Sequence, residues 1–249
     1  MDKTKRAVAL GYFDGLHIGH ADVLGKALGA SRDGLTPAVM LFDAPPSEVV
    51  SGITVPRLMT DFERDRILEG SGFELLRVSF GDIRDMSAAE FVESVLVEKF
   101  NAAEVYCGFN YSFGKNGAGS SETLKELCAN YGIDVLVSGE VQSNGEQISS
   151  SAIRGYIENG KIERANEMLG YSFGFTSPVF SGDHRGRLLG APTINQFLPE
   201  GLVTPKFGVY ASVAEVDGKL FPGVTNIGKR PTFDGASMRS ETFILGFSG

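Results

Sequence analysis

The chain has 249 residues, 42% of them apolar, and a formal net charge of −8. This length suits one large domain or two modest ones, and the acidic balance argues against broad nucleic-acid binding, which needs a basic face. The sequence contains neither an apolar run of about 18 residues nor a leader-like segment at its start. We therefore expect a cytoplasmic protein with neither a membrane nor a nucleic acid as partner.

The first informative stretch runs from Arg6 to His20, Arg-Ala-Val-Ala-Leu-Gly-Tyr-Phe-Asp-Gly-Leu-His-Ile-Gly-His. It predicts a buried strand over 7–10, a glycine-rich turn, and a helix that begins near His20. A helix N-terminus directs free N–H groups and a positive dipole end toward one point. His17 and His20 add imidazole donors there that can carry positive charge when an anion is near. We interpret the stretch as a phosphate site, the alternative being an ordinary solvated loop.

Short apolar runs then alternate with helical patterns, which is typical of a doubly wound parallel sheet. Two of the helices are expected to open on capping boxes, Thr60–Glu63 and Ser87–Glu90. In the second of them the predicted inward face is Phe91, Val92, Val95, Leu96 and Phe100, and a later helix carries Leu124, Leu127, Cys128 and Tyr131. The further strands are expected at 38–42, 75–78, 105–107 and 133–137.

The two cysteines, Cys107 and Cys128, are too few and too far apart for a disulfide scaffold or a zinc motif. Both stand in apolar surroundings, so we expect them to be small core residues.

Two more stretches of this region fit an anion site. A second glycine-rich turn, 108–119, follows the strand at 105–107 and contains Asn110. Consecutive serines at 149–151 predict an N-cap, with Arg154 in the first turn of the helix that follows. Serine hydroxyls, free N–H groups and a guanidinium all suit phosphate oxygens, the alternative being a plain capped helix with a solvated arginine.

The periodicity of apolar residues changes near residue 173. Val209, Ala211 and Val213 alternate with other residues, Asp217-Gly218 fits a hairpin turn, and no long helical pattern follows. We expect a doubly wound α/β domain over 1–170 and a small antiparallel β-domain over 171–249.

Five separated motifs resemble the bifunctional bacterial riboflavin kinase/FAD synthetases, and the resemblance spans nearly the whole chain. The motifs are Gly11-Tyr-Phe-Asp-Gly-Leu-His-Ile-Gly-His20, Gly108-Phe-Asn-Tyr-Ser-Phe-Gly114, Ile148-Ser-Ser-Ser-Ala-Ile-Arg154, Gly186-Arg-Leu-Leu-Gly-Ala-Pro-Thr-Ile-Asn195, and Phe207-Gly-Val-Tyr210 with Gly228-Lys-Arg-Pro-Thr232.

The resemblance implies that the first domain transfers AMP from ATP to FMN, giving FAD and pyrophosphate, with Mg²⁺ bridging the oxygens. His17 and His20 would hold the triphosphate, and Ser150 and Arg154 the departing phosphates. It further implies ATP or phosphate contacts at Gly11, Phe13, Asp14 and Gly19, and flavin or nucleotide contacts at Gly108 and Asn110.

The second domain would resemble a riboflavin kinase β-barrel, which makes FMN and ADP from riboflavin and ATP. The resemblance implies that Thr193 and Asn195 bind magnesium and that Glu241 is the general base. Gly182, Gly186 and Gly190 would let the backbone approach the ATP phosphates.

The chain also departs from the family pattern. The turn Asp43-Ala-Pro-Pro46 lacks the usual histidine, and the sequence given stops soon after the Glu241 strand, so we expect a barrel that does not close. The alternatives are another adenylyltransferase of the same superfamily, or a non-catalytic flavin- or nucleotide-binding protein. An aminoacyl-tRNA synthetase fits less well, because the chain is acidic and lacks a later lysine loop of the Lys-Met-Ser-Lys-Ser type.

Overall fold

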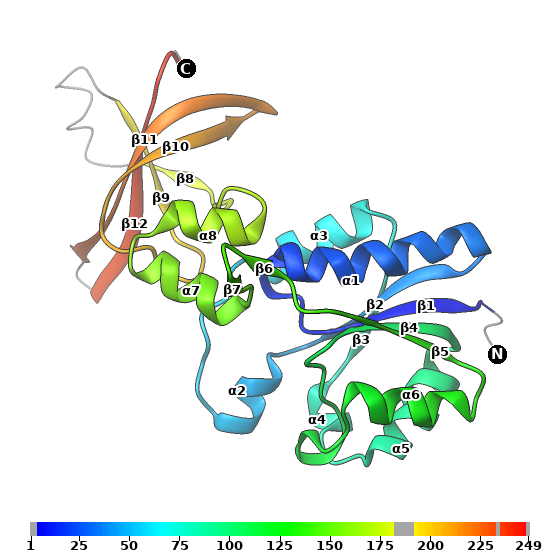
Figure 1. The fold of residues 1–249 in the computed structure, drawn as a ribbon. Helices are drawn as coiled ribbons and strands as arrows, with labels where there is room; N and C mark the ends of the chain where they lie inside the picture. Colours follow the sequence, from blue (N-terminus) through cyan, green and yellow to red (C-terminus); the bar gives the residue numbers. More distant parts are fainter. Residues whose placement is uncertain (1–3, 182–191, 233–234, 248–249) are drawn as a thin grey trace.

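A computed structural model describes residues 4–181, 192–232 and 235–247. Its first half is a five-stranded parallel sheet in the order β3-β2-β1-β4-β5 (Figure 1). The five strands are β1 (Arg6–Leu10), β2 (Thr36–Phe42), β3 (Glu74–Val78), β4 (Ala102–Gly108) and β5 (Asp134–Ser138). The parallel sheet and its alternation with helices confirm the predicted fold class.

Helices cover both faces of this sheet, which explains why β1 is apolar throughout. Val8 and Leu10 point to one face and Ala7 and Ala9 to the other, each within a buried cluster. Figure 1 shows α1 and α3 on one side of the sheet and α5 and α6 on the other. The helices of this half are α1 (Ile18–Gly29), α2 (Pro46–Ser51), α3 (Asp61–Gly70), α4 (Phe80–Ile83), α5 (Ala88–Glu90) and α6 (Ser121–Ala129), with short 3₁₀ turns η1 (Asp14–Leu16), η2 (Ala30–Asp33) and η4 (Lys115–Gly117).

Both capping boxes are present, at Thr60 with Glu63 and at Ser87 with Glu90. The helix that the second box opens continues as a π-helix, η3 (Phe91–Lys99), and not as the expected α-helix. All five of its predicted inward residues are buried. Their spacing, 91, 95–96 and 100, exceeds the 3.6 residues of an α-helical turn, so a wider turn keeps them on one line.

The other predicted helices and strands begin and end within about one helical turn of their expected positions. The first helix begins at Ile18, two residues before the expected start, because His17 caps it. Cys107 and Cys128 are buried core residues, as expected, and burial raises the pKa of the Cys107 thiol to about 11. Tyr131 lies beyond the end of α6 and is exposed, so its expected place on the helix is wrong.

A third buried cluster holds the helices that lead to the second half. Ile153 and Ile157 of α7 (Ser150–Glu158) pack with Met168 of α8 (Ile162–Leu169), with Leu58, and with Val203. A short hairpin, β6 (Gln142–Ser143) and β7 (Glu146–Gln147), precedes α7. This cluster joins residues of the first half to a segment from the second.

The second half is an antiparallel sheet in the order β10-β11-β12-β9-β8, and Asp217-Gly218 forms the predicted hairpin turn. In the described residues it is an open sheet, and Val209 and Val213 are 69% and 65% exposed on its surface. The predicted alternation of exposed and less exposed residues is therefore present in this strand, and its valines point outward. The strands are β8 (Val179–Phe180), β9 (Thr193–Phe197), β10 (Gly208–Val216), β11 (Lys219–Thr232) and β12 (Gly235–Ile244).

Among the described residues, no helix combines the length and the apolar character needed to cross a bilayer.

The third cluster makes a stability prediction. Replacing fully buried Ile153 by alanine removes packing atoms between α7 and α8, and we expect the free energy of unfolding to fall by about 3 kcal/mol. The matched control is Ile67→Ala, because Ile67 is 42% exposed on α3 and should lose less than about 1 kcal/mol. Urea unfolding of both variants measures the difference, and equal losses would contradict the assignment of this core.

Candidate active site at the carboxyl edge of the parallel sheet

All five parallel strands lead into one cavity of about 520 Å³. Its lining includes a residue at or just after the carboxyl end of each strand: Gly11, Phe42, Phe80, Gly108 and Ser138. In open parallel sheets ligands bind at this edge, beside the point where the strand order reverses. Here the order reverses between β1 and β4, and the cavity lies beside both.

Two histidines lie at the centre of the cavity wall. The rings of His17 and His20 stack at 3.6 Å between centroids, with 15° between their planes. The Nδ1 atom of His17 accepts the backbone N–H of His20 at 3.2 Å, so this ring caps the N-terminus of α1. A neutral imidazole that accepts at Nδ1 carries its proton on Nε2 and can donate it to a ligand.

Both imidazoles are neutral at pH 7. Burial lowers the pKa of His17 to about 4, and burial together with the neighbouring His17 lowers the pKa of His20 well below 6.5. Among the described residues, the His20 Nδ1 atom is buried and has no hydrogen-bond partner. The site therefore offers an anion neutral N–H donors and a helix dipole, where sequence analysis expected imidazoles able to carry positive charge.

The cavity lining is also free of carboxylates in the part of the chain that the structure describes. Its polar groups are hydroxyls, amides and glycine backbone, and Arg84 is its cation. Such a lining does not repel a polyphosphate. In the same residues there is no group of three or more acidic, histidine or cysteine side chains able to hold a metal.

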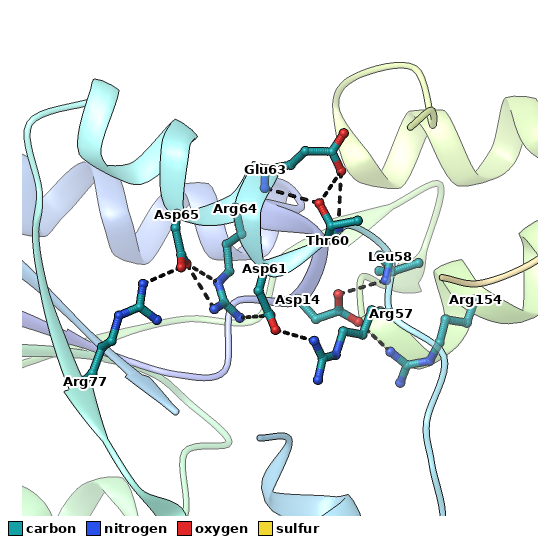
Figure 2. Close-up of polar contacts among 10 residues, drawn as sticks. All are labelled: Asp14, Arg57, Leu58, Thr60, Asp61, Glu63, Arg64, Asp65, Arg77 and Arg154. Atoms are coloured by element: carbon teal, nitrogen blue, oxygen red, sulfur yellow. Dashed lines mark hydrogen bonds and ion pairs between the residues drawn. The ribbon is translucent and has the colours of Figure 1, made fainter. Parts of the chain in front are cut away.

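The structure brings most of the expected residues of the first domain into this lining. Those that line it are Gly11, Phe13, His17, Gly19, His20, Gly108, Asn110 and Ser150. Asp14 and Arg154 are not among the lining residues, and Figure 2 shows their side chains directed at one another. A direct contact of either with phosphate stays a prediction.

Asp14 and Arg154 form an ion pair of 2.8 Å. Asp14 is only 5% exposed, and its other oxygen accepts the Leu58 N–H at 2.8 Å. Burial raises the pKa of the Asp14 carboxyl, while the Leu58 amide and Arg154 oppose the shift. Arg154 is the fifth residue of α7, so its expected place in the first turn is wrong. One turn further along, its guanidinium reaches Asp14.

Sequence reasoning missed the aromatic part of the lining, which includes Tyr12, Phe42, Phe80, Phe109 and Tyr111. Phe42 and Phe80 meet edge to face at 5.5 Å. The position of Phe42 and Phe80 at the ends of two expected strands was the available signal, because the carboxyl ends of parallel strands share one edge.

A second group of expected residues lies on the antiparallel sheet. Thr193 and Asn195 share one face of β9, and Asn195 pairs in register with Glu241 of β12. Glu241 pairs on its other side with Asn226 of β11, which sequence analysis did not single out. Cross-strand partners point to the same face, so these residues form one polar row. Gly182, Gly186 and Gly190 lie outside the described residues.

Comparisons with known proteins match both halves of the chain. A family model described as FAD synthetase matches residues 1–152, and one described as riboflavin kinase matches residues 169–249. A bifunctional riboflavin kinase/FMN adenylyltransferase of Bacillus subtilis (strain 168) is 38% identical over 93% of this chain and 74% of its own length. The chain belongs to the bifunctional riboflavin kinase/FMN adenylyltransferase family.

Other relatives carry the same name. The protein of Listeria monocytogenes is 35% identical over 97% of this chain and 78% of its own length, and that of Escherichia coli K12 is 31% identical over 96% and 77%. A solved structure from Streptococcus pneumoniae, described as a macrolide-efflux protein, superimposes with a TM-score of 0.89 at 30% identity. The superposition covers all of this chain and 82% of the Streptococcus pneumoniae chain.

The neutral histidines give this family member a pH-dependent stability. An unfolded histidine titrates near pH 6.5 and His17 at about 4, so between these values the unfolded chain binds more protons than the folded chain. The contribution of neutral His17 to the free energy of unfolding is fully present above pH 6.5. It is lost as the pH falls, by about 2–3 kcal/mol at pH 4.5. Urea unfolding between pH 4.5 and 7 measures it.

The matched variant is His17→Asn, because asparagine keeps an N-cap oxygen for α1 and removes the titrating ring. We expect the free energy of unfolding of this variant to depend less on pH over the same range. Identical pH dependence in the two proteins would show that His17 is not buried as a neutral ring.

Proposed function

We propose that the parallel-sheet domain transfers AMP from ATP to FMN, giving FAD and pyrophosphate, and that the antiparallel domain phosphorylates riboflavin to FMN. The observation that carries the first activity is the stacked pair His17–His20 at the start of α1, in a cavity whose described lining lacks carboxylates. We assign the first activity to residues 1–170 and the second to residues 171–249, with ATP, FMN and riboflavin as the substrates.

Adenylyl transfer joins two anions, so the task of the protein is positioning and charge stabilisation. An FMN phosphate oxygen attacks the α-phosphorus of ATP, and pyrophosphate leaves on the opposite side. The Nε2–H of His17 and the first N–H groups of α1 donate to the phosphates, and the Ser150 hydroxyl lies in the same wall. The aromatic lining supplies flat surfaces for the ring systems of both substrates.

Magnesium supplies charge neutralisation between the reacting phosphates when it is bound. Residues 1–170 need only accept it as part of the nucleotide complex, since the cavity offers neutral oxygen atoms, among them those of Asn110, Ser112 and Ser150. In the second domain Thr193 and Asn195 would hold the ion.

In the second domain Glu241 accepts the proton of the ribityl hydroxyl that attacks the γ-phosphorus of ATP. Asn195 and Asn226 flank it in register on the neighbouring strands, on the same face of the sheet. The register of β9, β11 and β12 therefore supports a general base with an amide on each side.

One assay tests the proposal and separates its alternatives. The full chain is incubated with ATP and Mg²⁺ and with either FMN or riboflavin, and the flavins are separated by chromatography. We expect FAD from FMN and FMN from riboflavin. A different adenylylated product from another acceptor would favour a related adenylyltransferase, and unchanged flavins would favour a binding protein.

Two single variants should divide the activities between the domains. His17→Asn removes the Nε2–H donor but keeps the helix cap, and we expect FAD formation from FMN to fall about 100-fold. Glu241→Gln removes the general base, and we expect riboflavin phosphorylation to fall about 100-fold with FAD formation within twofold of the unaltered chain. If either variant lost both activities equally, the assignment of one site to each domain would be wrong.

Magnesium dependence can be tested without a variant. With excess EDTA we expect FAD formation to stop and to return when Mg²⁺ exceeds the chelator, because the ion neutralises the reacting phosphates. After dialysis the protein alone should carry less than stoichiometric magnesium, since the ion enters with ATP. Stoichiometric magnesium in the dialysed protein would reveal a resident site in the chain.

A further inference from the structure

The turn between β1 and α1 has an unusual backbone. Phe13, Gly15 and Leu16 all have positive φ, at 57°, 78° and 41°. A side chain at Gly15 would meet the Leu58 side chain at 2.7 Å, so this position accepts only glycine. Positive φ costs free energy at Phe13 and Leu16, and such a turn persists where the surroundings fix it.

Four hydrogen bonds from outside the turn fix it. Asp14 accepts from the Leu58 N–H and from Arg154, both at 2.8 Å, and its backbone carbonyl accepts from the Ser150 hydroxyl at 3.1 Å. The fourth and shortest bond is from the Tyr171 hydroxyl to the Gly15 carbonyl, at 2.6 Å. Tyr171 follows α8 and lies in the stretch that the riboflavin kinase model matches.

The second half also supports Leu58, one of the residues that hold the turn. Arg57, its neighbour, donates its N–H to the Gly201 carbonyl at 2.7 Å and accepts from the Val203 N–H at 2.8 Å. Tyr171 therefore holds the β1–α1 turn directly, at Gly15. Gly201 and Val203 hold it indirectly, because they bind Arg57, the neighbour of Leu58. Both contacts tie the turn to residues beyond 170. Two residues after Gly15, the same turn delivers His17, the cap of α1.

We propose that Tyr171 is a positioning residue for adenylyl transfer: its hydroxyl holds the Gly15 carbonyl and so fixes where His17 and the first N–H groups of α1 point. The inference rests on the proposed function of this site. Burial also raises the pKa of the Tyr171 hydroxyl, so it stays protonated and donates across the working pH range.

The test removes one oxygen atom. Tyr171→Phe keeps the ring and loses the bond to Gly15. The matched control is Tyr156→Phe, because the Tyr156 hydroxyl makes a bond of the same length, 2.6 Å, to Glu146. Tyr156 lies two residues after Arg154, about 200° around the axis of α7, so it faces away from the Asp14 contact. Both variants are made in the full chain, and their thermal unfolding midpoints are compared.

We expect kcat for FAD formation to fall about tenfold in Tyr171→Phe, with KM for ATP changed less than threefold, because donors held in place act mainly in the transition state. In Tyr156→Phe both constants should stay within twofold. Equal losses of kcat in the two variants would reduce Tyr171 to a general structural role and overturn the proposal.

Amide hydrogen exchange provides a readout that needs no activity. Peptides covering residues 13–20 should exchange faster in Tyr171→Phe and unchanged in Tyr156→Phe. Unchanged exchange over 13–20 in Tyr171→Phe would overturn the proposal as well. An unaltered chain that makes no FAD would contradict the proposed function, and the exchange data would still decide whether Tyr171 holds the turn.

Discussion

The ion pair between Asp14 and Arg154 is the interaction on which the proposed adenylyl-transfer site depends. A carboxylate that is 5% exposed is costly to bury unless it is paired and hydrogen-bonded, and Asp14 has both a guanidinium and a backbone N–H. The two partners are 140 residues apart in the sequence. Their pairing fixes the start of α7 against the β1–α1 turn, so the walls that carry Ser150 and His17 are held at a set separation.

Arg154 is bound to Asp14 and lies outside the lining, so the cavity offers phosphate other groups. His17 and His20 are neutral because burial lowers the pKa of both rings, and the neighbouring His17 lowers the pKa of His20 further. Neutral donors and a helix dipole bind an anion without the large desolvation cost of a buried cation. Under the proposed function, Arg84 is the cation of the described lining, and further positive charge would come with the substrate as magnesium.

Local patterns in the sequence were enough to predict the five strands of the parallel sheet, the two capping boxes, the hairpin at Asp217-Gly218 and the cavity residues around His17. These features depend on neighbours within a few positions. The partner of Arg154 and the bond from Tyr171 could not be predicted in the same way. They depend on which distant segments pack together, and a single sequence does not contain that information in its local periodicity.

The pairing also changes how Arg154 should be studied. Replacing it by alanine leaves Asp14 buried and unpaired, which is strongly destabilising in proteins generally. A loss of FAD formation in that variant would therefore report on the turn as much as on any phosphate contact. The hydroxyl of Tyr171 and the ring of His17 are better probes, because each can be removed without uncovering a buried charge. Tyr171 holds the turn at Gly15, and His17 follows two residues later at the start of α1. A variant of Tyr171 therefore tests how the turn is held, and a variant of His17 tests what the turn presents to the nucleotide.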